Sequence, residues 1–378
     1  MSNKKNNSLV VSNSCPHTML KFQLIEKYVA RWSKVLSASK LCEWLIFIDP
    51  MSNSGIYRDS NTNAEIEGTT LRVANILKDE ATKNPNIKIL MLVNDISQSK
   101  INRLKIESTV RELQDTDNFK IVTSCEDKCD FLKSIGKNLK QNRKSTIHTL
   151  LFYDPYDADI DWEVIEPFIN RWGEVIINHF ISDPVRGLSQ AKDKLLVYER
   201  TYKTTSEQLR NEFSSDPSEY RERLREIVRV IRNYKPDEYF ISGFPFFNRV
   251  NGLLYEIVHL TSHQKGFNLF KSSAWETFNG HSSNKNRKAD DDQLTLMLGD
   301  YLPGDSSCYT IQNIADFLIN EHRGKDKVFI PELYKPLEYH EIFPSGCFKK
   351  EIKDFLPAKG VKKSRQGRKE VYDFSNLE

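Results

Sequence analysis

Two aspartates stand at the ends of apolar runs, each directly before a proline. Asp154 follows the run 149–153, and Asp49 follows the run 44–48. Proline cannot donate a hydrogen bond to a sheet ladder, and it restricts the preceding residue to an extended backbone, so we expect a strand to end at each aspartate. In open α/β sheets, ligands bind at the carboxyl edge of the strands. The pattern therefore predicts a polar site built from strand-end carboxylates.

A third carboxylate, Asp95, follows the apolar run 87–93, and the segment after Asp49 is small and polar, with Ser52 and Gly55 in it. In a nucleotide-type α/β fold, the loop after the first strand approaches the ligand closely and needs small residues. An acidic residue at the end of the next strand can accept hydrogen bonds from ribose hydroxyls. This layout is typical of S-adenosylmethionine-dependent methyltransferases, in which the protein orients an acceptor for in-line transfer.

The segment Asp154-Pro155-Tyr156 is the predicted acceptor site. The Tyr156 ring could stack on a planar acceptor amine, while the Asp154 carboxylate and the Pro155 carbonyl accept its hydrogens as charge develops on nitrogen. Taken alone, the three residues are explained equally well as an ordinary strand exit.

The surrounding pattern predicts an α/β fold. Its apolar runs are continuous rather than alternating, which is typical of strands covered on both faces. Amphipathic segments between the runs predict helices and right-handed crossovers, hence a parallel sheet; they are 70–81, 98–113, 129–139 and 162–172. Two later runs, 238–245 and 253–262, flank Asn251-Gly252 and predict an antiparallel pair at one edge.

Bulk composition excludes several classes of protein. The chain has 378 residues, and 55 Lys and Arg against 52 Asp and Glu give a formal net charge of +3. The charge of the whole protein thus gives no reason to expect nucleic-acid binding, which would need a local surface. The absence of a long apolar run and of a signal-peptide core predicts a cytoplasmic protein. The six cysteines lack the spacing of a zinc site, so we expect reduced thiols and no metal.

Composition shifts divide the chain into four parts. We expect a short disordered N-terminal segment (1–18), a Rossmann-like methyltransferase domain (19–280), a polar linker (281–300) and a small C-terminal domain (301–378). The large domain contains a charged helical insertion at about 193–234, whose helix 207–232 could be a lid or a brace.

The C-terminal part predicts a winged helix-turn-helix domain. A helix is expected at 310–319 with Thr310 as its N-cap, and a second at 343–355. They precede a basic, glycine-containing hairpin whose five cations could contact phosphates of DNA or RNA; they are Lys362, Lys363, Arg365, Arg368 and Lys369. A solubilising hairpin in a small interaction domain explains the pattern equally well.

The order of these motifs resembles the three-Cys-motif partner proteins, a bacterial family with a methyltransferase-like domain. The resemblance covers about the first two-thirds of the chain, and a winged-helix tail is also seen in relatives. The matching positions are His17-Thr18, Lys21, Tyr28, Trp32, the segment Asp49 to Tyr57, Gly68-Thr69-Thr70, Asp154 to Asp157 and Ile176-Ile177-Asn178. The resemblance implies a class I methyltransferase sheet, a cofactor site that includes Tyr57, and a three-Cys-motif protein as partner.

Three positions depart from the family pattern. Pro50 and Asn53 replace glycines in the loop after Asp49, and Asp157 replaces the glycine after Tyr156. Asn53 can still adopt a positive φ.

Two hypotheses follow. In the first, an S-adenosylmethionine-dependent methyltransferase acts on an amine of a nucleic-acid base or a related acceptor. Its cofactor is held by Asp49, Ser52, Gly55, Tyr57 and Asp95, and its acceptor by Asp154, Pro155 and Tyr156. In the second, the methyltransferase-like domain is catalytically silent, and the C-terminal domain binds nucleic acid or a partner protein.

Overall fold

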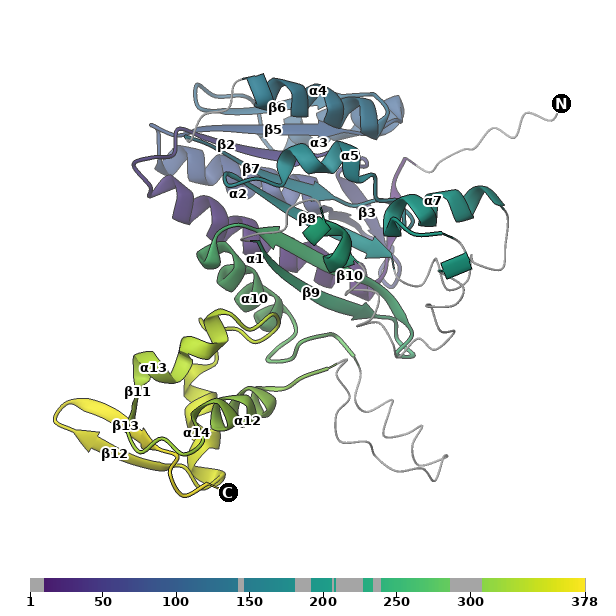
Figure 1. Cartoon of the computed structure of the whole chain (residues 1–378). Coiled ribbons are helices and arrows are strands. Elements are labelled where there is room, and N and C mark those ends of the chain that lie inside the picture. The colour runs from purple at the N-terminus through teal and green to yellow at the C-terminus, as the bar shows by residue number, and fades with distance from the viewer. Residues whose placement is uncertain are drawn as a thin grey trace. The chain divides into compact units, whose positions relative to one another are not determined.

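The structure is a computed structural model that describes residues 10–141, 146–180, 192–205, 207–208, 227–233, 239–285 and 308–377 (Figure 1). The chain divides into two compact units, Met1–Asn178 and His179–Glu378. This boundary lies inside the range 19–280 that we predicted to be one domain. Most of the charged insertion and the linker beyond residue 285 lie outside the described residues.

The central sheet has seven strands in the order β6-β5-β2-β7-β8-β10-β9. Numbered along the chain, that order is 3-2-1-4-5-7-6. The neighbours from β6 to β8 pair in parallel and β9 pairs with β10 antiparallel. The predicted fold class, a Rossmann-like class I methyltransferase sheet with an antiparallel edge, is confirmed. The strands are β2 (Trp44–Asp49), β5 (Lys88–Asn94), β6 (Phe119–Ser124), β7 (Ile147–Tyr153), β8 (Gly173–Phe180), β9 (Phe240–Phe247) and β10 (Leu253–Thr261).

The strand order reverses direction on either side of β2, which places β5 on one flank and β7 on the other. Such a switch point opens a crevice at the carboxyl ends of the strands. Residues 45–49 of β2 and 148–153 of β7 are buried, because both sheet faces are covered. The continuous apolar runs of the sequence thus become the two strands that flank the crevice.

Helices fill the connections, and those predicted at 70–81, 98–113 and 129–139 are confirmed. In the first unit they are α1 (Pro16–Ser37), α2 (Thr69–Lys83), α3 (Gln98–Val110), α4 (Lys128–Gln141), α5 (Trp162–Ile165) and the 3-10 helix η1 (Glu166–Phe168). The second unit contains α7 (Lys192–Tyr202) and α10 (Gln264–Thr277), and α10 packs against β9 and β10.

The helix predicted at 162–172 was too long. It ends at Ile165 and continues only as η1. Pro167 lacks an N–H for an α-helical bond, and the side-chain oxygen of Asn170 accepts from the Trp172 N–H at 2.9 Å. The Asn170 turn leads directly into β8.

The expectation of a disordered segment over 1–18 was wrong for its described part. Residues Ser12–Ser14 form β1, which pairs in parallel with β3 (Ile56–Asp59), and α1 begins at Pro16. With β4 (Glu65–Glu67) they make a three-stranded sheet, β1-β3-β4. Sequence patterning missed β1 because its three residues, Ser-Asn-Ser, carry no apolar signal.

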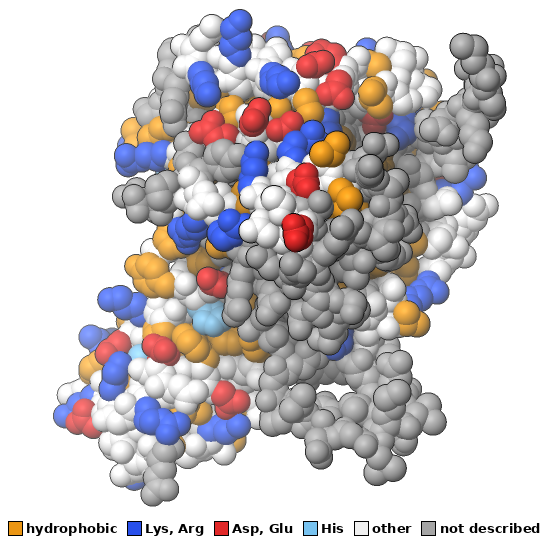
Figure 2. All heavy atoms as spheres, turned by 45° about the vertical axis from the view of Figure 1, so that its right-hand side comes forward, with side chains coloured by type: hydrophobic (Ala, Val, Ile, Leu, Met, Phe, Trp, Pro, Cys, Tyr) orange, Lys and Arg blue, Asp and Glu red, His pale blue; other side chains and the backbone are white. Residues whose placement is uncertain are grey.

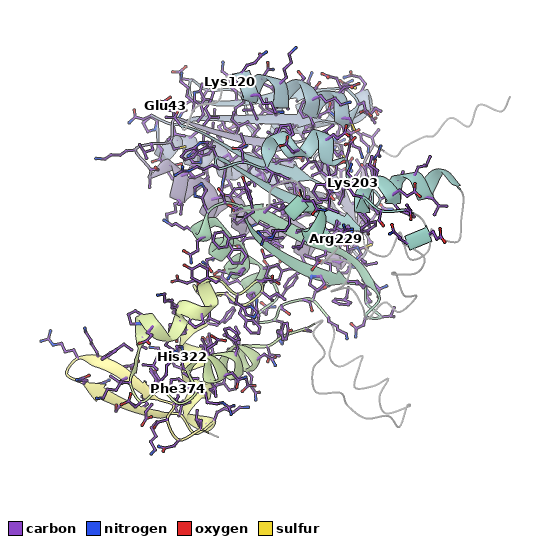
Figure 3. The ribbon with its side chains drawn as sticks, in the orientation of Figure 1. Glu43, Lys120, Lys203, Arg229, His322 and Phe374 are labelled. Atoms are coloured by element: carbon purple, nitrogen blue, oxygen red, sulfur yellow. The ribbon has the colours of Figure 1, made fainter. Side chains whose placement is uncertain are left out.

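The C-terminal region contains helices and a small antiparallel sheet, β11-β13-β12. Its elements are α12 (Ile311–His322), β11 (Val328–Phe329), α13 (Ile330–Tyr334), η3 (Lys335–Glu338), α14 (Lys349–Ala358), β12 (Lys362–Gln366) and β13 (Lys369–Asp373). His322 and Phe374 pack in its core with ring centroids 5.5 Å apart (Figure 3). Thr310 is the N-cap of α12, as predicted, and its N–H donates to the Asn313 side chain at 2.8 Å.

The helix predicted at 343–355 begins six residues later, at Lys349. Pro344 and Gly346 disfavour a helix before that point, and Phe348 has a left-handed backbone with φ of 55°. The predicted basic hairpin is present as β12 and β13. The interpretation of this region as a winged helix-turn-helix stays a prediction.

Among the described residues, no helix is long and apolar enough to cross a membrane. Nor do they contain a group of three or more His, Cys, Asp or Glu side chains that could hold a metal ion. Basic and acidic side chains are interspersed on the face seen in Figure 2, as expected from the near-balanced composition.

Candidate functional site

Asp49 ends β2 and is buried, with 2% of its surface exposed. Its Oδ2 accepts a 2.8 Å hydrogen bond from the Thr70 hydroxyl in the first turn of α2, and its Oδ1 accepts one of 3.1 Å from the Met51 N–H. Burial raises the pKa of Asp49 to about 7, opposed by these two bonds and assisted by the nearby carboxylates of Asp154 and Asp95. Asp49 is therefore a carboxyl group able to titrate near neutral pH.

The loop after Asp49 depends on two residues with positive φ, Asn53 at 57° and Gly55 at 74°. Asn53 thus adopts the backbone that a glycine would supply, as the sequence allowed. Its backbone N–H donates to Asp95 Oδ2 at 3.2 Å, and its side-chain amide donates to the Ser12 hydroxyl at 2.8 Å. A Cβ atom on Gly55 would lie 2.7 Å from Leu104 Cδ1. Gly55 is therefore required by packing and backbone alike.

Ser52 and Pro50 connect this loop to β5. The Ser52 N–H and hydroxyl donate to the Asn94 carbonyl at 2.8 and 3.1 Å, and the Asn94 amide donates to the Pro50 carbonyl at 3.1 Å. Pro50, which departs from the family pattern, thus retains a structural role through its carbonyl. These bonds join the ends of β2 and β5.

Asp95 is buried and makes several contacts. Its Oδ1 accepts from the Ser97 N–H at 2.9 Å, and its Oδ2 lies 3.7 Å from Lys100 Nζ. Lys100 also donates to the Tyr156 hydroxyl at 3.1 Å, and its ammonium lies 5.4 Å from the centroid of that ring. Lys100 therefore joins the predicted cofactor residue Asp95 to the predicted acceptor residue Tyr156.

Asp154 lies directly after β7 and has a partner at each carboxylate oxygen. Lys21 Nζ of α1 donates to Oδ2 at 2.6 Å, and the Asn178 amide of β8 donates to Oδ1 at 2.5 Å. Pro155 is buried, whereas Tyr156 is 68% exposed. The carboxylate is thus held in a fixed orientation beside an exposed aromatic ring.

Tyr57 lies in β3 and belongs to the same site. Burial, followed by the charge of Asp154, raises the pKa of Tyr57 well above its usual range, with smaller contributions from Tyr156 and Asp49. Tyr57 is thus close enough to feel the charge of Asp49, in the predicted cofactor half-site, and of Asp154, in the predicted acceptor half-site. The structure therefore brings the predicted residues of the cofactor and acceptor sites together at one sheet edge; they are Asp49, Ser52, Gly55, Tyr57, Asp95, Asp154, Pro155 and Tyr156.

Sequence reasoning gave no role to Lys100, and none to Lys21 and Thr70 beyond their places in the family resemblance. Asn178 likewise appears in the sequence analysis only through that resemblance. A cation one turn after the strand-end Asp95 could have indicated Lys100. No local signal connects Lys21 to Asp154, which is 133 residues away.

The five basic residues predicted to contact phosphates lie on the exposed hairpin β12–β13. Lys363 is paired with Glu370 at 3.0 Å, and Glu370 also pairs with Lys353 at 3.0 Å. Hydrogen bonds from Lys363, then Lys353, lower the pKa of Glu370 to about 2. Glu370 thus offsets part of the positive charge of the hairpin, while Lys362, Arg365 and Arg368 remain exposed.

Comparison with solved structures gives distant likenesses. The chain is 9% identical to cofactor-bound Rv0187 from MTB over 63% of this chain and 79% of that one, with a TM-score of 0.32. It is 10% identical to the bifunctional kinase-methyltransferase WbdD (64% and 39% covered, TM-score 0.32). It is 9% identical to an O-methyltransferase family protein from Burkholderia thailandensis (61% and 55% covered, TM-score 0.26). The chain thus spans under two-fifths of WbdD and about half of the third protein.

No protein-family model matches the chain, and no curated protein matches it. The resemblance to the three-Cys-motif partner family stays a prediction. The assignment of a methyltransferase-like fold rests on the strand order of the sheet.

Proposed function

We propose that this protein binds S-adenosylmethionine and transfers its methyl group to an amine of a nucleic-acid base or a related planar acceptor. The observation that carries the proposal is the convergence of Asp49, Asp95 and Asp154 at the switch point of a class I methyltransferase sheet. In this fold class, ligands bind at that edge.

The residues present fit the cofactor. Asp95 Oδ1 accepts one hydrogen bond from the protein, so a second lone pair is available for a ribose hydroxyl. The left-handed backbone of Asn53 and the absence of a side chain at Gly55 preserve the loop conformation that a glycine-rich sequence would give. When bound, the cofactor supplies a methyl group on a sulfonium centre.

The acceptor half provides an aromatic face and an oriented acceptor of hydrogen bonds. The exposed Tyr156 ring can stack on a base, and Asp154 can accept a hydrogen bond from the base N–H because each of its oxygens retains a lone pair. Transfer of the methyl group would form the N–C bond from the amine lone pair, leave the electrons of the broken C–S bond on sulfur, and release the N–H proton to water. Lys21 and Asn178 keep the Asp154 carboxylate in place during the transfer.

Calorimetry with S-adenosylmethionine and S-adenosylhomocysteine tests cofactor binding. We expect binding by the wild type and at least a tenfold loss for Asp95→Ala, because the ribose hydroxyls lose their acceptor. Asp79→Ala removes an exposed carboxylate of α2 and is the matched control. No heat at millimolar ligand would contradict the proposal.

Radiolabelled methyl transfer then identifies the acceptor class. We expect label in DNA or tRNA rather than in protein fractions, and a loss of at least a hundredfold for Asp154→Asn, which keeps the shape of the side chain but removes its charge. Cofactor binding with label only in protein would overturn the acceptor assignment and retain the methyltransferase.

A second function is favoured by one observation. Lys100 already pairs with Asp95, and Lys21 already pairs with Asp154, so both carboxylates have a cationic partner without any ligand. In this alternative, the methyltransferase-like domain is catalytically silent, and the C-terminal hairpin binds nucleic acid, or the chain binds a three-Cys-motif protein. A full-length variant with Lys362, Arg365 and Arg368 changed to Gln tests the hairpin.

If the hairpin binds DNA, a plot of log affinity against log salt concentration has a negative slope. The magnitude of that slope should fall by about 0.9 for each phosphate contact removed. A variant with Lys327, Lys335 and Lys350 changed to Gln loses the same charge from exposed positions of the same region. Equal salt slopes for the two triple variants would rule out the hairpin as the phosphate contact.

A further inference from the structure

Lys100 is a buried cation at the point where the two half-sites meet. Its side chain is 9% exposed, and that of Asp95 is 5% exposed. Its ammonium is shared between the Asp95 carboxylate and the Tyr156 hydroxyl. A buried ammonium needs such partners, because leaving it unpaired would be costly.

The two contacts of Lys100 differ in length. The Tyr156 hydroxyl accepts a hydrogen bond at 3.1 Å, whereas Asp95 Oδ2 lies 3.7 Å away, beyond a normal hydrogen bond. Asp95 does not depend on Lys100 for donors, since the Asn53 and Ser97 N–H groups donate to it at 3.2 and 2.9 Å. The contact with Asp95 is therefore the one that a ligand can displace.

We propose that Lys100 is a positioning residue that couples the cofactor half-site to the acceptor half-site. Before cofactor binding, its ammonium partly neutralises Asp95. When ribose hydroxyls bind Asp95, the ammonium shifts fully to Tyr156 and fixes that ring for stacking. Its flexible four-carbon stem permits the shift. The proposal rests on the proposed function and adds an order of binding, with the cofactor before the planar acceptor.

The direction of the coupling can be measured at the cofactor site alone, because the coupling free energy between two linked sites is the same from either side. Lys100→Met removes the cation that competes for Asp95, so the affinity for S-adenosylhomocysteine should rise about threefold to tenfold. Tyr156→Phe removes the alternative partner of the ammonium, which then stays on Asp95. The affinity of Tyr156→Phe should therefore fall by a similar factor.

A double-mutant cycle by calorimetry with S-adenosylhomocysteine tests the coupling. In the Lys100→Met background, Tyr156→Phe should change affinity less than twofold. Lys100→Arg keeps a cation and should restore the sensitivity to Tyr156→Phe. Lys105→Met, on the exposed side of the same helix, should leave affinity unchanged. Thermal unfolding identifies any variant that is not folded, and Lys100→Gln then replaces Lys100→Met.

Three outcomes are distinct. The pattern above supports the coupling. Binding that is the same in the wild type and in Lys100→Met, or an equal effect of Tyr156→Phe in both backgrounds, overturns the coupling and leaves the proposed function intact. An absence of heat from every folded variant overturns both.

Discussion

The two Asp-Pro strand ends share a motif and differ in electrostatic environment. Asp49 is bonded to the Thr70 hydroxyl and a backbone N–H, with no cation paired to it among the described contacts. Asp154 is paired with Lys21 and bonded to Asn178. Burial raises the pKa of Asp49 to about 7. The same two residues at a strand end thus give one titratable carboxyl and one ion-paired carboxylate.

The difference shows that the motif determines where the carboxylate lies, while other segments of the chain supply its hydrogen-bond and ion-pair partners. Thr70 comes from α2, which follows β2 after the short strands β3 and β4, and Lys21 comes from α1, before the central sheet begins. A neutral hydroxyl tolerates either form of a carboxyl group, whereas an ammonium favours the ionised form.

The largest expected effect is the pH dependence due to Asp49. Its pKa is about 7 in the folded protein and about 3.9 in the unfolded chain. Between these values the folded state binds a proton that the unfolded state has lost. Stability contributed by Asp49 is therefore full below about pH 4 and lost as the pH rises to 7, by up to about 4 kcal/mol.

Asp49→Asn should remove this pH dependence. Urea unfolding from pH 4.5 to 7.5 measures the free energy of unfolding of the wild type and of the variant. Taking the difference removes the contribution of every group that titrates alike in both proteins. Asp79→Asn controls for the loss of a carboxylate from an exposed position. Parallel profiles for the wild type and Asp49→Asn would show that Asp49 and Asp154 do not differ in the proposed way.

Removing the cation should reveal how much Asp154 depends on it. Lys21→Met leaves the Asp154 carboxylate, 17% exposed, without its ion pair. We expect a loss of about 3 kcal/mol at pH 7, the lower end for breaking a buried pair. Denaturant unfolding measures it, and Lys34→Met on the exposed face of α1 is the control. Adding Asp154→Asn to Lys21→Met should recover most of the loss; no recovery would mean that Lys21 acts by packing alone.

Much of the fold could be predicted from the sequence because its signals are local. Continuous apolar runs indicated six strands of the central sheet, and each strand-end aspartate was placed at the correct edge. The edge strand β6 (Phe119–Ser124) was missed, because the strand is only partly buried and its residues form no continuous apolar run. The short strand β1 was missed because three small polar residues give no hydrophobic pattern. The helix predicted at 162–172 was too long because its apolar periodicity continues past Pro167, which cannot donate an α-helical hydrogen bond.

The positions of the site residues were largely predictable, but their charge partners were not. Lys21 and Lys100 contact Asp154 and Asp95 through tertiary packing, and no spacing rule indicates which lysine approaches which carboxylate. The conformation of Asn53 was anticipated, since asparagine tolerates positive φ.

The loop after Asp49 should be more sensitive to substitution than a free turn. Gly55→Ala places a Cβ atom 2.7 Å from Leu104 Cδ1 at a φ of +74°. Strain and crowding together should cost about 2 kcal/mol in unfolding free energy. Gly324→Ala is the matched control, because Gly324 has a φ of +79° and no atom within 4 Å of a built Cβ. Equal losses for the two variants would show that backbone strain alone explains the requirement.

The smallest effect tests the hydroxyl that holds Asp49. Thr70→Val keeps the shape of the side chain and removes the 2.8 Å hydrogen bond to Asp49 Oδ2. This bond lowers the pKa of Asp49, so its loss should raise that pKa and move the pH-dependent loss of stability to higher pH. Above pH 7 we expect a destabilisation of about 1 kcal/mol, the usual contribution of one hydrogen bond. Thr82→Val, at an exposed position of the same helix, should leave the pH profile unchanged. A Thr70→Val profile that matches the wild type would mean that burial alone sets the protonation of Asp49. The contrast with Asp154 would then be one of desolvation against ion pairing, with no contribution from the hydroxyl.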